Sequence, residues 1–332
     1  MPIEKLQLKK FTVFEDFGIS FSPGINVFIG ENGTGKTHLL KLLYLFTFDL
    51  EEDFGMRLFQ EIFSDELLDV IRNKDDANKA VMSCTIDGDV ETVDAIMWPF
   101  VGDKVPSIGG KVGVALNKPE AVFIPAKEML SHSKGLLALD RERKIPFDKT
   151  LIDIVAKTQL GQAKKQSPVK EKLMRELSQV IGGTVGLEQD VFYIIKETGL
   201  KVEFSMEAEG LRKLGLLWRL LENGLLTEGT VLLWDEPDGN VNPAKIPILV
   251  EVLLELQRNG VQIFIATHDY VLAKYFEVRR KPTDKVMFYS LYNSPRGVQC
   301  TKSVSFKDLR RNPIVEAFDQ LLDEVYDKSL GD

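Results

Sequence analysis

One glycine-rich stretch has the residue types and the spacing needed to bind phosphates: Gly30-Glu31-Asn32-Gly33-Thr34-Gly35-Lys36-Thr37. The apolar run 25–29 precedes it and the helix-forming run 38–43 follows it. The pattern G-x4-G-K-[ST] therefore stands between a predicted strand and a predicted helix, a context that a chance glycine-rich turn would lack. Glycines let backbone N–H groups turn toward phosphates, and the helix N-terminus adds partial positive charge.

These residue types predict ATP and Mg²⁺ as cofactors. Lys36 can reach the β- and γ-phosphates, and the hydroxyl of Thr37 can ligate Mg²⁺. The nucleotide-binding residues expected in this stretch are Gly30, Asn32, Gly33, Thr34, Gly35, Lys36, Thr37 and His38.

Two adjacent carboxylates follow a second predicted strand, at 231–234, in the order Asp235-Glu236-Pro237. Ligands of open α/β sheets bind outside the carboxyl ends of the strands. We expect Asp235 to hold Mg²⁺ and Glu236 to act as general base on the attacking water. Alone, the pair could be an ordinary acidic turn, but the phosphate loop favours the catalytic interpretation.

A histidine follows a third predicted strand, at 261–265, within Thr267-His268-Asp269. Adjacent parallel strands end at the same edge of a sheet, so we expect His268 near the γ-phosphate, where it can form a hydrogen bond. The predicted catalytic residues are therefore Lys36, Glu236 and His268.

Together these three motifs resemble the ABC-type ATPase heads, a group that includes SMC, RecF and OLD-like proteins. The long separation of Lys36 from Asp235 fits this group better than simple P-loop GTPases and kinases. The resemblance implies an α/β fold: a P-loop NTPase head of the ABC type with a mostly parallel sheet core, a small antiparallel β lobe and a helical lobe. It also implies ATP hydrolysis and dimerisation with ATP sandwiched between two subunits.

The resemblance assigns further roles. Ala208-Glu209-Gly210 corresponds to the signature loop that contacts the γ-phosphate of a second subunit. Ala208 replaces the usual serine, and the alternative interpretation is that this segment is only a loop that caps the following helix. The loop 238–243 corresponds to a dimer contact. No glutamine follows the predicted strand 121–124, where the family often has one near Mg²⁺, and Lys127 or Glu128 could substitute.

We expect one ABC-type domain over residues 1–332. Its expected parts are a core at 1–50 and 116–127, a β-rich insertion lobe at 51–115, a helical lobe and hairpin at 128–205, a core with the carboxylate pair at 206–292, and a C-terminal strand and helix at 293–332. The coiled-coil arms of SMC proteins and the nuclease domain of OLD proteins are missing from this pattern.

The composition limits the classes of protein to consider. The chain has 332 residues, 44% hydrophobic and 28% charged, with a net charge of −8 and two cysteines. Two cysteines in unrelated contexts argue against a disulfide framework or a zinc site. The longest apolar stretch, 39–50, contains Lys41 and is too short to span a bilayer, and the N-terminus lacks a signal-peptide layout. These features predict a cytoplasmic protein without a membrane partner.

Three functions compete. The leading one is an ATP-driven homodimerising switch in DNA maintenance or phage defence, with a partner nuclease or effector. The alternatives are the nucleotide-binding subunit of an ABC transporter and an ATP-binding scaffold with negligible turnover. DNA is a candidate client, but no aromatic residues interleave the basic ones, which favours solvated helix faces. The basic candidates are Lys164, Lys165, Lys170, Lys172, Arg175, Arg279, Arg280 and Lys281, and Phe11 or Phe14 is a candidate for adenine stacking.

Overall fold

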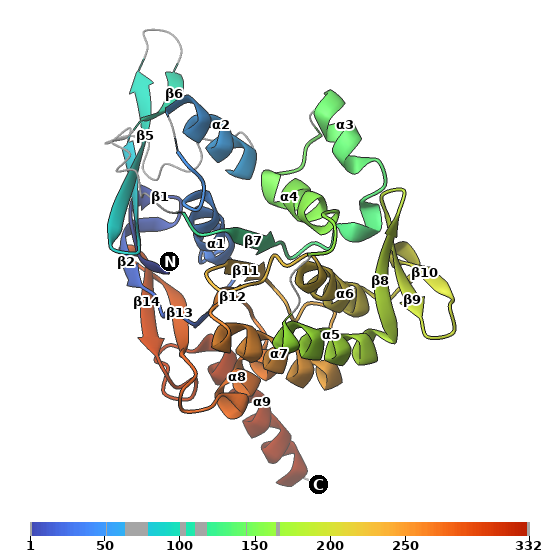
Figure 1. Ribbon diagram of the computed structural model, residues 1–332. Helices are drawn as coiled ribbons and strands as arrows, with labels where there is room; N and C mark the ends of the chain where they lie inside the picture. The colour runs from blue at the N-terminus through green and yellow to red at the C-terminus, as the bar shows by residue number, and fades with distance from the viewer. Residues whose placement is uncertain are drawn as a thin grey trace.

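The computed structural model describes residues 2–50, 52–63, 79–99, 104–109, 118–143, 145–163 and 167–330. Its centre is a six-stranded sheet in the order β14-β13-β3-β12-β11-β7 (Figure 1). Neighbouring strands are parallel except for the hairpin of β13 and β14. The bounds are Ile25–Gly30 for β3, Ala121–Ile124 for β7, Val231–Asp235 for β11, Gln262–Ala266 for β12, Val286–Ser294 for β13 and Gly297–Ser303 for β14.

The apolar runs that predict strands are all found in this sheet. Every residue of β3, β7, β11 and β12 is buried, because helices or a second sheet cover both faces. Such unbroken apolar runs are typical of buried parallel strands. The predicted α/β class with a mostly parallel core is therefore confirmed.

A second, antiparallel sheet has the order β2-β1-β4-β5-β6. It consists of β1 (Ile3–Phe11), β2 (Phe14–Ser20), β4 (Lys79–Ile86), β5 (Asp89–Pro99) and β6 (Lys104–Gly109). The expected small antiparallel lobe is present, and β1, from the segment 1–50 that the sequence analysis grouped with the core, pairs with β2 on one side and with the insertion strand β4 on the other. The alternating burial of β1 explains this, since one of its faces packs inward and the other faces solvent.

Helix α1 (Lys36–Leu45) joins the two sheets into one core. Its leucines belong to the same apolar cluster as side chains of β1, β2, β4 and the facing side of the central sheet. A buried amide strengthens the junction: Gln262 accepts a hydrogen bond from the Ile3 N–H at 2.8 Å and donates to the Ile3 and Ser22 carbonyls at 2.9 Å. The short helix α2 (Glu52–Phe63) flanks α1.

Helices cover the other face of the central sheet and form a second apolar cluster with it. They are α4 (Lys149–Thr158), α5 (Pro168–Ile181), α6 (Glu209–Glu222), α7 (Ile246–Arg258) and α8 (Tyr270–Arg279), with α3 (Leu136–Arg143) beside α4. A small sheet of β8 (Gly183–Glu188), β9 (Val191–Lys196) and β10 (Lys201–Glu203) extends this lobe. Among the described helices, none is long and apolar enough to cross a bilayer.

The helix boundaries follow local chemistry. Asn242 accepts a hydrogen bond from the Ala244 N–H at 2.9 Å and so caps the turn that leads into α7. Gly260 follows α7 with a φ of 83°, a conformation that glycine adopts freely. The last helix, α9 (Pro313–Leu330), begins at the side of the molecule and projects away from it (Figure 1); its first turns hold the Phe318 ring stacked on Tyr270 at 4.2 Å.

Candidate ATP-binding site

The loop between β3 and α1 needs its glycines. Gly33 and Gly35 have φ of 79° and 82°, in the left-handed region. A Cβ at Gly30 would lie 2.3 Å from the Leu291 carbonyl oxygen, and one at Gly35 would lie 2.8 Å from the Phe14 ring. The loop is therefore held tightly between the central sheet, at Leu291, and the antiparallel sheet, at Phe14.

Lys36 lies inside this loop. Its Nζ donates hydrogen bonds to the carbonyls of Gly30 and Glu31, both at 2.9 Å. Burial lowers the pKa of Lys36 to about 8, while the nearby Asp235 and Glu236 carboxylates oppose that shift. The cation is thus held where the loop would wrap a phosphate, bonded to carbonyls that a phosphate can replace.

Thr37 and Asp235 meet at the carboxyl edge of the sheet. The Thr37 hydroxyl donates to Asp235 Oδ2 at 2.7 Å. Burial raises the pKa of Asp235, and the hydroxyl hydrogen bond counteracts it. A hydroxyl and a carboxylate together are hard oxygen donors of the kind Mg²⁺ prefers, so these residues fit the metal.

Glu236 and His268 face each other beside Lys36. Glu236 has a φ of 48°, unusual for a residue with a side chain, and its N–H donates to the Ala266 carbonyl at 2.9 Å. Its Oε1 lies 4.0 Å from Nε2 of His268, and 47% of the Glu236 side chain is exposed. Burial and the charge of Lys36 lower the pKa of His268, which keeps the imidazole neutral at pH 7. The carboxylate is thus open to water while the histidine can form a hydrogen bond with a phosphate.

Lys213 is a member of this site that the sequence analysis missed. It is buried on α6, and its Nζ donates to the Glu236 carbonyl at 2.9 Å. Burial lowers its pKa, against the opposing effect of the surrounding carboxylates. A signal was available: Lys213 lies among Gly210, Leu214 and Leu217 on the face of α6 that periodicity predicts to be buried.

The expected signature loop forms the N-terminus of α6. Ala208 occupies the N-cap position and offers no side-chain hydrogen bond. A Cβ at Gly210 would lie 2.5 Å from the Asn240 carbonyl oxygen, so the start of α6 packs directly on the loop 238–243. The contacts of Ala208, Glu209 and Gly210 with a phosphate involve a second copy and stay a prediction.

The loop 238–243 is also tied to the histidine motif. The Thr267 hydroxyl donates to Asp238 Oδ1 at 2.6 Å and accepts from the Asp269 N–H at 2.9 Å. Asp269 in turn caps α8 by accepting from the Leu272 N–H. Signature helix, carboxylate loop and histidine loop therefore form one connected assembly.

Other predicted residues have different surroundings. Thr34 is buried, and its hydroxyl donates to the Glu31 carbonyl at 2.8 Å, which closes the loop, whereas Asn32 is exposed. The His38 ring lies 5.9 Å from that of Phe63. The adenine-stacking candidates are wrong: Phe11 and Phe14 are fully buried between the sheets, because the apolar core recruits them.

Lys127 and Glu128, the two candidates to replace the missing glutamine, contact other residues instead. Glu128 forms an ion pair with Arg212 at 3.2 Å and accepts hydrogen bonds from the N–H groups of Leu130 and Ser131. The ammonium of Lys127 lies 5.3 Å from the centre of the Phe147 ring. Glu128 therefore links the β7 loop to the signature helix.

The basic residues named as candidates for DNA binding differ in their positions and in the partners of their side chains. Lys172 and Arg175 on α5 each lie 3.8 Å from a glutamate one turn away, as expected for a solvated helix face. Lys170 donates to the Glu222 carbonyl at 3.0 Å. Lys164 and Lys165 lie outside the described residues, and Arg279, Arg280 and Lys281 lie at the end of α8.

A phosphate loop after β3, carboxylates after β11 and a histidine after the intervening strand β12 define a P-loop ATPase head of the ABC type. Comparisons with known proteins agree. A family model described as an AAA ATPase domain matches residues 1–172, and the chain belongs to that family. A second model, an AAA domain with a suggested AbiEii toxin assignment in type IV TA systems, matches residues 112–274.

Short segments of the chain are similar to RecF proteins. RecF, the DNA replication and repair protein, is 48% identical over 48 residues in Limosilactobacillus fermentum and 51% identical over 45 residues in Ligilactobacillus salivarius. These matches cover 14% of this chain and only 13% and 12% of those relatives.

Two solved Smc heads share the fold. One, bound to the C-winged helix domain of ScpA, has a TM-score of 0.57 at 15% identity, covering 91% of this chain and 98% of that one. The Pyrococcus furiosus head with an extended coiled coil, bound to the C-terminal domain of ScpA, has a TM-score of 0.56 at 14% identity, covering 98% and 99%.

Proposed function

We propose that this protein hydrolyses ATP with Mg²⁺ and that ATP binding drives its homodimerisation. The observation that carries the proposal is the meeting of Thr37 and Asp235 at 2.7 Å, with Glu236 and His268 beside them. Sequence segments far apart in the chain thus supply a phosphate cation, a metal ligand pair and a general base at one edge of the sheet.

Each side chain has a chemical role in this proposal. Mg²⁺ held by Thr37 and Asp235 would neutralise charge on the β- and γ-phosphates. Lys36 exchanges its carbonyl partners for phosphate oxygens. Glu236 orients the attacking water and accepts its proton, and neutral His268 donates a hydrogen bond to the γ-phosphate. Because Glu236 is open to solvent, water reaches it without a rearrangement of the loop.

Dimerisation would complete the site. The first turn of α6, at Ala208, Glu209 and Gly210, would approach the γ-phosphate bound by the partner copy through its backbone N–H groups and helix dipole. Without a hydroxyl at Ala208, that contact depends on the backbone alone. Hydrolysis would remove the γ-phosphate and release the partner.

The setting we propose is the cytoplasm, in DNA maintenance or phage defence, with nucleic acid as client and a nuclease or effector as partner. Support comes from the RecF relatives, named for DNA replication and repair, and from the Smc heads, solved with ScpA domains bound. Cys84 and Cys300 form no disulfide, which suits a reducing compartment.

The test is the molar mass of the Glu236→Gln variant by light scattering, with and without ATP and Mg²⁺. We expect a monomer that becomes a dimer when ATP is added, because this variant retains the nucleotide. Lys36→Ala in the same background is the control and should stay monomeric. A mass that is the same with and without ATP would refute the switch.

The ATP-binding scaffold is the second candidate, because the Ala208 cap lacks the usual hydroxyl. It predicts ATP binding without phosphate release. A steady release of phosphate by the unmodified protein, abolished by Glu236→Gln, excludes it.

A further inference from the structure

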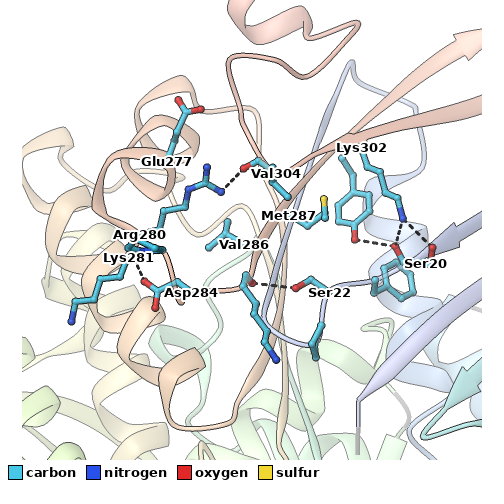
Figure 2. A pocket seen from close by; sticks show the side chains of 15 residues that line it. Ser20, Ser22, Glu277, Arg280, Lys281, Asp284, Val286, Met287, Lys302 and Val304 are labelled. Atoms are coloured by element: carbon cyan, nitrogen blue, oxygen red, sulfur yellow. Dashed lines mark hydrogen bonds between the residues drawn. The ribbon is translucent and has the colours of Figure 1, made fainter.

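A groove of about 750 Å³ lies at the amino-terminal ends of β3 and β13, the sheet edge opposite to Lys36 and Thr37. Three segments far apart in sequence line it: the turn after β2, the segment from the end of α8 to β13, and β14 with the residue that follows it (Figure 2). Its volume is in the range of ligand sites and exceeds what one phosphate needs.

Four cationic side chains line this groove: Arg280, Lys281, Lys285 and Lys302. Lys302 donates to the Ser20 hydroxyl at 3.0 Å, and Arg280 donates to the Val304 carbonyl, so both have neutral partners. Within the described part of the chain, none of the four cations forms an ion pair. In a protein with a net charge of −8, such a cluster marks a local preference for anions.

The two carboxylates of the groove each form an ion pair with a residue outside its lining. Asp284 accepts two hydrogen bonds from Arg258, at 2.9 and 2.6 Å, and its side chain is only 1% exposed. Glu277 pairs with Lys274 at 2.5 Å and accepts from Ser305 at 3.0 Å. Both acids are therefore engaged by cations outside the lining of the groove, although Asp284 shares Arg258 with Glu251 and Glu255. Because the Asp284 side chain is almost fully buried, the charged groups that the groove presents to an anion are mainly Arg280 and the lysines.

Apolar side chains form the floor between these cations. Figure 2 shows Val286 and Met287 between Lys281 on one side and Lys302 on the other. The half-buried Phe21 also lines the groove, and the Ser22 hydroxyl at its margin donates to the Lys285 carbonyl at 3.2 Å. Cations on both sides of an apolar floor match a single strand, which has charged phosphates and bases whose flat faces can lie on apolar side chains.

We propose that this groove binds a single-stranded nucleic acid, with phosphates on Arg280, Lys281, Lys285 and Lys302 and bases over the half-buried Met287 and Phe21. The inference rests on the part of the proposed function that names nucleic acid as client. It is independent of dimerisation, because the groove is at the far edge of the sheet from the ATP site.

The test uses the Lys36→Ala protein, in which the ATP site cannot retain phosphates, and a fluorescein-labelled oligothymidylate of about 16 nucleotides read by anisotropy. Lys281→Glu with Lys285→Glu should weaken binding at least ten-fold. It should also flatten the salt dependence, by about 0.7 in log–log slope for each lost phosphate contact. Lys285→Gln, which removes one charge and is mild toward folding, should show a smaller change in the same direction.

The matched control is Lys172→Glu with Arg175→Glu on α5, which makes the same change in net charge on an exposed face. It should bind like the parent. If the α5 variant weakened binding as much as the groove variant, the effect would come from net charge alone, and the proposed site would be wrong. The site would also be wrong if the groove variant bound the oligothymidylate as tightly as the parent. Competition experiments give a further test. If a mononucleotide or polyglutamate, at the same total charge, displaced the labelled strand as well as unlabelled oligothymidylate does, the groove would not be a site for a single strand. Because Glu236→Gln dimerisation is measured separately, failure here leaves the ATP switch intact.

Discussion

The Thr37 hydroxyl and the Asp235 carboxylate, 198 positions apart in the sequence, form a hydrogen bond of 2.7 Å. The hydroxyl proton occupies the lone pair of the carboxylate that a metal would use. In the proposed function both side chains would hold Mg²⁺, and the ion would take the place of this hydrogen bond. The two oxygen donors are thus already adjacent at the place where we propose a metal.

Thr37→Val keeps the shape of the side chain and removes the metal ligand. We expect turnover of ATP to fall at least on the order of ten-fold at low Mg²⁺, and to recover in part when Mg²⁺ is raised. The measurement is phosphate release across a Mg²⁺ titration. Thr37→Ser retains the hydroxyl and should resemble the parent; equal losses in both variants would contradict a ligand role.

The pKa of Lys36 predicts how ATP affinity depends on pH. A polyanion binds the protonated amine, so affinity is complete below a pKa of about 8 and declines as pH rises through that value. The expected decline is about ten-fold per pH unit above 8, measured by nucleotide titration of the Glu236→Gln variant. Lys36→Arg, whose guanidinium stays protonated, should bind with no inflection near pH 8.

Lys213 predicts a positioning effect on catalysis. Lys213→Met fills similar space and removes the charged hydrogen bond to the Glu236 carbonyl. Such a bond is worth about 1.5–3 kcal/mol, so we expect kcat to decrease on the order of ten-fold or more, with KM for ATP within about two-fold. Lys213→Arg should recover part of the rate. A rise in KM with kcat unchanged would assign Lys213 to binding instead.

Gly210 is predicted to be intolerant of a side chain. In Gly210→Ala the new Cβ would meet the Asn240 carbonyl at 2.5 Å, so α6 or the loop 238–243 must shift. We expect a loss of about 1–3 kcal/mol in the free energy of unfolding, measured by urea denaturation. Gly161→Ala is the control, because nothing lies within 4 Å of its Cβ and its φ is ordinary.

The Arg258–Asp284 pair predicts a pH-dependent stability. The hydrogen bonds from Arg258 lower the pKa of Asp284, so the pair stabilises the fold above the unfolded pKa of about 4 and this contribution is lost as pH falls through the folded pKa. Asp284→Asn should reduce the free energy of unfolding at pH 7 by about 1–3 kcal/mol. The difference from the parent should shrink below pH 4; a constant difference at pH 3 would contradict the linkage.

The parts predicted from sequence are those specified locally. Apolar runs before Gly30, Asp235 and His268 identify buried strands, because period and composition suffice for fully covered strands. The joining of β1 to β4 depends on pairing between distant segments, which no local pattern encodes. Phe11 shows the same limit. An aromatic side chain is suited to stacking on a base, but only the packed structure shows that Phe11 is buried in the core between the two sheets.

The candidate site divides in the same way. Lys36, Thr37 and Asp235 follow from motif and strand context, whereas Lys213 reaches the site only because α6 packs on the loop after β11. The cationic groove is the extreme case. The basic run at Arg280 and Lys281 is visible in the sequence, but Lys302 is not part of it, and its position across the groove from them is a product of the fold.

Helix α6 has a consequence of its own, because its first turn is the part that we propose to contact a partner, while Lys213, one turn later, donates a hydrogen bond to the Glu236 carbonyl. Because both residues are on one continuous helix, a displacement of its first turn would also displace Lys213. Engagement of Gly210 by a partner's nucleotide would therefore be felt at the hydrolytic carboxylate of the same chain, with no flexible relay between them. In a dimer of two such chains, the nucleotide bound by each subunit would therefore influence the rate of ATP hydrolysis in the other.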